Sequence, residues 1–370
     1  CYRMADFKTA IEKYNKALTI AQNANLNNQI AKCSNLKSLA HIMVGEFDIA
    51  LDLLNKSIKQ NQEISNQEGL ISAQTNLGSY YRLIGETKKS TTALELAESM
   101  VINTNNNKLL AKLYNSIGLT YCAEFNWQDA QTYFHSALEI YTLSGDHVNI
   151  ANCYNNFGIM YSDRGNYPKA AEFLHRAIII DQTLDNMPQL ATSYDNLGIV
   201  LTACGDYNNA YRFLKKSLAI STNLNNQLAM SQTFTNIGNL LLVKQEYDNA
   251  MEYFEKALEI DTKFNLWNSI LADYNNIGNI LFYQKEYDKA IDLYQKAENM
   301  AQDKDDKKSL AAVYNNLGNI YYDIEQYQLS ENYYLLALTI NQNIKDQPGE
   351  ALNLSNLAAV YLTTNKIKKS

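Results

Sequence analysis

One residue type returns at a fixed step through most of this sequence. The step is 40 residues, and no insertion disturbs it between the first and last of the seven glycines Gly78, Gly118, Gly158, Gly198, Gly238, Gly278 and Gly318. A period of this size means that one supersecondary unit repeats and stacks on its own copies. The length of 370 residues would otherwise suggest two or three globular domains, but the repeat overrides that expectation.

The repeated glycine lies inside a predicted helix. In the third unit, Tyr114 is followed at steps of 3, 4 and 7 by Ile117, Gly118 and Tyr121, which is the spacing of one helical stripe. Glycine inside a helix costs about 1 kcal/mol relative to alanine. Because it returns in every unit despite this cost, we predict that it removes a Cβ where another helix approaches closely.

A turn and a second helix follow each glycine. The turns carry glycine in earlier units (Gly45, Gly165, Gly205) and other residues in later ones (Gln245, Lys285, Glu325). Glycine there suits the C′ residue of a helix, where φ is positive, so we expect the later turns to be less clearly capped. In the second helix, two alanines flank one ring, as in Ala130, Phe134 and Ala137. This stripe predicts tight packing, with helix axes about 8–10 Å apart.

Each unit is thus a helical hairpin that buries its apolar face against its neighbours. We predict one array over residues 1–370, with a half repeat over 1–27, eight full repeats over about 28–347 and a half repeat over about 348–370. Neither end shows a polar capping helix. Either the chain is a fragment or other segments cover its ends, and we favour the fragment.

The unit resembles the tetratricopeptide repeat. The resemblance rests on the apolar-Gly-x-x-Tyr pattern of the first helix and on two alanines seven residues apart in the second, such as Ala170 and Ala177. A tyrosine such as Tyr154 replaces the family's tryptophan, the closing proline is missing, and the unit is longer than the usual length of about 34 residues. This long form is similar to the repeats of kinesin light chain, Pins-type G-protein regulators and bacterial sensor and regulator proteins. The resemblance implies an all-α fold, a right-handed superhelical α-solenoid of helical hairpins.

Composition excludes several classes of function. The net charge of −7 argues against a nucleic-acid binder, since such proteins usually carry a basic stripe. No apolar run approaches the roughly 20 residues of a membrane helix, so we expect no membrane insertion. The cysteines are odd in number and form no C-x-x-C pair, which favours reduced thiols and a cytoplasmic location. They are Cys1, Cys33, Cys122, Cys153 and Cys204.

No pattern for catalysis or metal binding stands out. His135 and His175 occupy equivalent positions in the second helix, but other units carry Asn, Glu, Lys or Gln there, which is typical of a solvated face. The sequence contains no phosphate loop, no G-x-S-x-G and no H-E-x-x-H motif. We therefore expect no enzymatic activity, no metal site and no cofactor.

A column of asparagines goes beyond what packing requires. It stands two residues before the repeated glycine, with Ser116 as the one break. We call it the asparagine ladder: Asn76, Asn156, Asn196, Asn236, Asn276, Asn316 and Asn356. A carboxamide can both donate to and accept from a peptide backbone, and in the resembled family this position faces the concave groove. With units about 10 Å apart, an extended peptide would meet an asparagine at about every third residue. Alternatively, the amides tie neighbouring helices together, and the two roles are compatible.

The groove is also predicted to change in character along the chain. Helix positions that usually point inward in the family are basic in the N-terminal half and aromatic toward the C-terminus. These groove candidates are Lys32, Arg82, Lys112, Phe282, Tyr283 and Tyr322. Aromatic anchors are common hot spots of interfaces. The alternative for the rings is that some of them pack between units.

Two functions fit these observations. The first is a protein-interaction scaffold that binds an extended or helical peptide segment of a partner protein in its concave groove. The second is the sensor or regulatory region of a larger bacterial signalling protein, a histidine kinase or transcription regulator, whose output domain lies outside this chain. Neither identifies the partner or the oligomeric state.

Overall fold

The computed structural model describes residues 4–101 and 104–364, so Cys1 lies outside the described residues. Within these ranges all regular secondary structure is helical, which confirms the all-α expectation. The first helix of a hairpin is called helix A: α2 (Asn27–Met43), α4 (Gln67–Leu83), α6 (Asn107–Ala123), α8 (His147–Asp163), α10 (Met187–Ala203), α12 (Gln227–Val243), α14 (Trp267–Tyr283), α16 (Lys307–Asp323) and α18 (Gln347–Thr363). The second is helix B: α1 (Met4–Asn23), α3 (Phe47–Glu63), α5 (Thr87–Val101), α7 (Trp127–Leu143), α9 (Tyr167–Thr183), α11 (Tyr207–Asn223), α13 (Tyr247–Phe264), α15 (Tyr287–Asp303) and α17 (Tyr327–Ile344). Every helix A from α2 onward begins 40 residues after the previous one.

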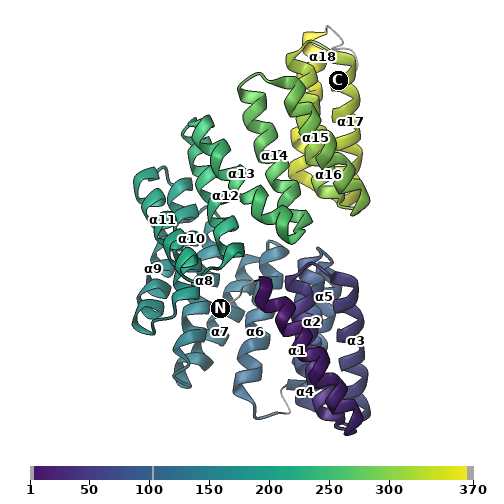
Figure 1. The fold of residues 1–370 in the computed structure, drawn as a ribbon, viewed down its shortest axis with the longest axis vertical. Coiled ribbons are helices and arrows are strands. Elements are labelled where there is room, and N and C mark those ends of the chain that lie inside the picture. Colours follow the sequence, from purple (N-terminus) through teal and green to yellow (C-terminus); the bar gives the residue numbers. More distant parts are fainter. Residues whose placement is uncertain (1–3, 102–103, 365–370) are drawn as a thin grey trace. The chain divides into compact units, whose positions relative to one another are not determined.

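The chain forms two compact units, Cys1–Asn236 and Ile237–Ser370, and α12 contributes to both (Figure 1). Within a unit, helix A packs on helix B of its own hairpin, as α8 does on α9, and on helix A of the next hairpin, as α4 does on α6 and α14 on α16. Within a unit, one side of a helix A is therefore covered by its hairpin partner, and its flanks by helices of the neighbouring repeats. None of the described helices is long and apolar enough to cross a membrane.

The repeated glycine makes the close approach that its position predicts. A Cβ built on Gly198 would lie 2.6 Å from Cγ of Leu214 in the facing helix B and 3.4 Å from the backbone oxygen of Ala210. The same contact recurs in every hairpin that has the glycine, with the ring of Phe134 facing Gly118. A side chain in this column would overlap atoms that are already packed, which explains why the column stays glycine despite its cost in a helix.

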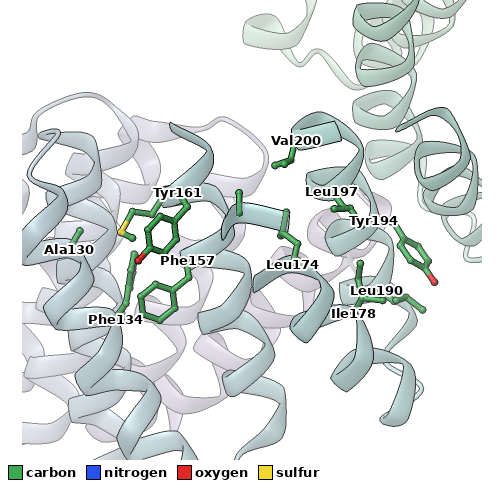
Figure 2. Close-up of a cluster of buried hydrophobic side chains, with 12 residues drawn as sticks. Ala130, Phe134, Phe157, Tyr161, Leu174, Ile178, Leu190, Tyr194, Leu197 and Val200 are labelled. Atoms are coloured by element: carbon green, nitrogen blue, oxygen red, sulfur yellow. The ribbon is translucent and has the colours of Figure 1, made fainter. Parts of the chain in front are cut away.

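The core of unit 1 is built from these hairpin contacts (Figure 2). Phe134 of α7 meets Phe157 of α8 edge to face, with ring centroids 5.4 Å apart. Leu174 of α9 and Leu197 of α10 are fully buried in the same cluster. The apolar residues of one hairpin are thus covered by the next, as the stripe of the sequence predicts.

The later turns are as well capped as the early ones, so the expectation of weaker capping was wrong. Gln245, Lys285 and Glu325 have φ of 61°, 62° and 63°, in the same left-handed region as Gly205 at 80°. The N–H of Gln326 donates to the carbonyl of Tyr321 at 2.8 Å, which is the bond that closes a Schellman turn. The capping hydrogen bonds hold a non-glycine residue in this conformation at a cost of about 1 kcal/mol.

Candidate peptide-binding groove

The asparagine ladder bonds to a second column of asparagines, which stands three residues before the glycine or, for Asn35, before Ser38 at the equivalent position. In each pair, the ladder amide donates to the side-chain oxygen of the residue 41 positions earlier, on helix A of the preceding repeat. The five bonds are Asn76 to Asn35 (2.9 Å), Asn156 to Asn115 (2.7 Å), Asn196 to Asn155 (3.3 Å), Asn316 to Asn275 (3.4 Å) and Asn356 to Asn315 (2.9 Å). At these five positions the ladder ties neighbouring helices together, as the alternative interpretation predicts.

The remaining two ladder residues differ. The position 41 residues before Asn236 is occupied by Asp195, and both side chains are buried. Burial raises the pKa of Asp195 to about 6, while hydrogen bonds from Thr233 and Ser217 act in the opposite direction. Asn276 is half-buried on α14. The sequence signal that predicts the partner column is the doubled asparagine that recurs before the glycine, as at Asn155-Asn156.

Part of the ladder also lines a hollow in unit 1. We call it the ladder hollow; it has a volume of about 330 Å³ and lies on α6, α8 and α10. Its lining residues are Asn115, Leu119, Asn152, Asn155, Asn156, Ile159, Gln189, Thr192 and Asn196. A carboxamide has two N–H donors and an oxygen with two lone pairs. Because the bond of Asn156 to Asn115 uses one N–H of Asn156, the structural role and a ligand-binding role are compatible for this side chain.

Sequence reasoning missed the apolar side chains of this hollow. They are Leu119 and Ile159, which follow the repeated glycine directly. Ile199 recurs at the next 40-residue step but does not line the hollow. Ile159 lines the hollow and is 42% exposed. An aliphatic stripe beside a row of amides can cover an apolar side chain of a peptide while the amides hold its backbone. The 40-residue spacing of these residues was the available signal.

The basic groove candidates lie on α2, α4 and α6. The Lys112 ammonium donates to the Asn76 oxygen at 3.2 Å, and surrounding protein lowers the pKa of this lysine by desolvation. Lys112 also lines a second hollow of about 400 Å³, together with Lys108. Burial lowers the pKa of Arg82, whose buried Nε has no hydrogen-bond acceptor among the described residues. Lys32 is exposed on α2.

The aromatic candidates sit at the end of helix A in unit 2. Phe282 packs against Tyr287, and Tyr322 against Tyr327, with centroid distances of 6.1 and 5.6 Å. Tyr283 stacks on Tyr247 at 5.6 Å and remains exposed. Tyr287 and Tyr327 are the first residues of α15 and α17, so Phe282 and Tyr322 pack at the turn of their own hairpin. This agrees with the packing interpretation, and a ligand-anchoring role for these rings stays a prediction.

Other chemical groups do not converge. Within the described ranges, no three His, Cys, Asp or Glu side chains are close enough together to hold a metal ion. The His135 ring lies 4.8 Å from the ring of Phe157. The four cysteines of the described chain are unpaired, and burial raises the pKa of Cys122 and of Cys153 to about 12, so both remain protonated thiols at neutral pH.

The chain matches one family of known proteins. A family model described as tetratricopeptide repeat matches residues 109–182, 189–263, 229–303, 270–343 and 309–370. No curated protein matches the chain.

Several solved structures have a similar fold. A Rap protein complexed with competence and sporulation factor superimposes with a TM-score of 0.60 at 16% identity, covering 92% of this chain and 98% of that one. The apo form of RapI gives 0.58 at 18% identity, with 75% and 99% covered. A STAND signal-transduction ATPase with a tetratricopeptide repeat sensor, from Pyrococcus horikoshii, gives 0.58 at 20% identity, with 84% of this chain and 46% of that one covered. At these identities the similarity shows the shared fold.

Proposed function

The chain belongs to the tetratricopeptide repeat family, whose arrays generally serve as protein-interaction modules, and we propose that it binds a peptide segment of a partner protein in the groove of unit 1. The observation that carries the proposal is the ladder hollow. Seven of its nine lining side chains are amides or hydroxyls, and the other two are Leu119 and Ile159. Amides that can both donate and accept match the alternating N–H and C=O groups of an extended backbone.

The second column of asparagines fixes the side chains of the ladder in position to bind a peptide. Asn155 donates to the Ser193 hydroxyl of α10 at 2.8 Å, while its oxygen accepts from Asn196. Asn156 is fixed in the same way against Asn115 of α6. Side chains whose rotamers are already held lose little conformational entropy when a ligand binds. The inter-repeat bonds therefore support binding by preorganising the amides.

A second candidate function is a sensor or regulatory region of a larger signalling protein. It is supported by the fold shared with a STAND protein's tetratricopeptide repeat sensor, which accounts for part of that larger protein. Both functions use the same groove. They differ in whether the peptide signal is passed to an output domain encoded beside this chain, which the sequence of the complete gene would reveal.

The binding proposal can be tested with a displayed library of random twelve-residue peptides, selected on the purified chain. Enriched peptides are then labelled with fluorescein, and their Kd is measured by fluorescence polarisation. We expect Ile159→Arg to weaken binding at least about tenfold, because it places a charged side chain in the ladder hollow and removes apolar contact.

The matched control is Ile179→Arg. Ile179 is 62% exposed on α9 and does not line the hollow, so the same substitution there should leave the Kd unchanged. Circular dichroism and thermal melting establish that both variants fold. If folded Ile159→Arg binds every selected peptide as well as the wild type does, unit 1 does not use this groove.

A further inference from the structure

The ladder hollow is the middle part of a longer groove in unit 1. On one side, Asn152 of the ladder hollow donates to Asn149 at 3.2 Å. Asn149 lines the neighbouring hollow of about 400 Å³, here called the lysine hollow. On the other side, Gln189 and Thr192 line both the ladder hollow and a third hollow of about 280 Å³. The three hollows thus follow one another across α6, α8, α10 and the start of α12.

The lysine hollow provides positive charge. Lys108 and Lys112 are one helical turn apart on α6, and both residues reach solvent, although surrounding protein partly desolvates the Lys112 ammonium, which donates to Asn76. Among the described residues neither ammonium is within ion-pair distance of a carboxylate. Two carboxylates accept hydrogen bonds from asparagines that line this hollow: Glu68 from Asn106 at 3.0 Å, and Asp146 from Asn149 at 2.8 Å. An acidic group of a ligand would find two cations here in a protein whose net charge is −7.

The third hollow is apolar and has walls from distant parts of the sequence. Phe7 of α1 and Met43 of α2 line it opposite Pro188, Leu224 and Leu228. We call it the apolar hollow. The helix that contributes Phe7, α1, is the dark purple helix of Figure 1. The Phe7 side chain is buried, whereas Met43 is 51% exposed. The first helix of the chain therefore contributes directly to one end of the groove.

Resting on the proposed function, we propose that the occupant is an extended protein segment with an acidic side chain in the lysine hollow and a large apolar side chain in the apolar hollow. The amides of the ladder hollow hold the backbone between them. Helix A steps of about 10 Å from α6 to α12 give a span of about 30 Å. At about 3.3 Å per residue, the acidic and apolar residues are about nine positions apart. The start of α1 is part of this binding site.

The selected library peptides test this composition. We expect them to share an acidic residue and, about nine positions away, a Leu, Ile, Met or Phe. Replacing both Lys108 and Lys112 by Gln should weaken their binding about tenfold, and the loss should shrink in about 0.5 M NaCl because salt screens exposed charges. Lys215→Gln on α11, which is also exposed, is the matched control and should have no effect.

The apolar end is tested by Met43→Gln, which keeps the length of the side chain and makes it polar. We expect binding to weaken about fivefold for peptides that carry the apolar residue. A peptide with that residue changed to Ser should bind equally weakly to the wild type and to the variant. Leu143→Gln, an exposed position of α7, controls for a general effect of the substitution.

The outcomes separate this inference from the proposed function. If peptides are selected that require Ile159 but lack an acidic residue, or bind equally well after the lysine and Met43 changes, the groove binds peptides and the inferred composition is wrong. If binding requires a free C-terminal carboxylate and is lost on amidation, the anion is the chain end, which also overturns the acidic side chain. If no selected peptide depends on Ile159, the proposed function itself fails.

Discussion

The residue that follows the repeated glycine differs in type and in contacts between hairpins of unit 1 and hairpins of unit 2. In three hairpins of unit 1 it is aliphatic, at Leu119, Ile159 and Ile199, and the last two side chains are 42% and 44% exposed. In two hairpins of unit 2 it is an amide that is already bonded: the Tyr294 hydroxyl donates to Asn279, and the Tyr334 hydroxyl to Asn319, each at 2.7 Å.

The residue of helix B that faces the glycine differs as well. It is Leu174 or Leu214 in the hairpins with Ile159 and Ile199, and Tyr294 or Tyr334 in the hairpins with the bonded amides, whereas in the remaining hairpin of unit 2 Phe254 faces Gly238 and has no hydroxyl to donate. Only tyrosine reaches past the glycine with a hydroxyl, and it uses the acceptor that a ligand would need. The same repeat position can therefore present an exposed apolar side chain or a hydrogen-bonded amide, and the amide is bonded where helix B provides a tyrosine.

The largest expected effect concerns the junction between helix B and the next helix A. In unit 1 this junction pairs Asp181 with the Ser193 hydroxyl at 3.1 Å. In unit 2 it pairs two buried carboxyls, Asp261 and Asp273. Burial, followed by the charge of Asp261, raises the pKa of Asp273 to about 8. The folded state therefore holds a proton that the unfolded state releases near pH 4.

The direction of the pH dependence of stability follows from the raised pKa of Asp273. The stabilising contribution of protonated Asp273 is complete below about pH 4 and is lost as the pH rises through about 8. We expect Asp273→Asn to stabilise the protein by about 3 kcal/mol at pH 9 and to have little effect at pH 4, with the gain growing between these two values. Urea unfolding over this pH range measures it. Burial also raises the pKa of Asp181, against the hydrogen bonds from Ser193 and Asn186, so Asp181→Asn should show a smaller gain of the same sign. An unchanged pH slope in Asp273→Asn would contradict the shared-proton pair.

The next effect concerns the glycine contacts. Gly198→Leu should lower the free energy of unfolding by about 1–3 kcal/mol, because the new side chain overlaps Leu214. Gly278→Leu should cost more, by about 0.5–1.5 kcal/mol, since it displaces Tyr294 and breaks its hydrogen bond to Asn279. Thermal and urea unfolding give both values, with Ile199→Leu as the control. Equal stability of wild type and Gly198→Leu would refute the close-contact explanation.

A smaller effect isolates the tyrosine hydroxyl. Tyr294→Phe should cost about 0.5–1.5 kcal/mol, the net contribution of one hydrogen bond. The double variant Tyr294→Phe with Asn279→Ile imitates the pattern of unit 1 and should recover part of the loss, because no buried polar atom remains unpaired. Urea unfolding of the two variants measures this. Were the double variant less stable than the single one, the two patterns would not be interchangeable.

The smallest effect concerns the turns between helix A and helix B. Lys285 has φ of 62°, whereas the equivalent residue in unit 1, Gly205, has φ of 80°. Lys285→Gly relieves the strain of the left-handed conformation but raises the conformational entropy of the unfolded chain. It should therefore stabilise the protein by less than about 1 kcal/mol. Gly205→Ala should destabilise by about 1 kcal/mol. Thermal melting of the pair checks both signs, and a loss of stability in Lys285→Gly would show that the lysine side chain makes a compensating contact.

Much of the fold follows from the sequence alone. The 40-residue step, the glycine contacts and the alanine stripes are all predicted correctly from the sequence, because they depend on residues within one hairpin. Local periodicity fixes which residues face the neighbouring helix, and the repeat multiplies that signal.

Tertiary structure decided what the asparagines do. A residue 41 positions away comes into contact only when hairpins stack, so the bond from Asn156 to Asn115 could be weighed from the sequence but not assigned. The contribution of Phe7 to a hollow that includes Pro188 is more distant still, since it depends on how successive hairpins of unit 1 are placed. The sequence determined the hairpin and its period. The side chains available to a ligand were settled only by packing between hairpins, because that packing consumes some polar groups and leaves others open.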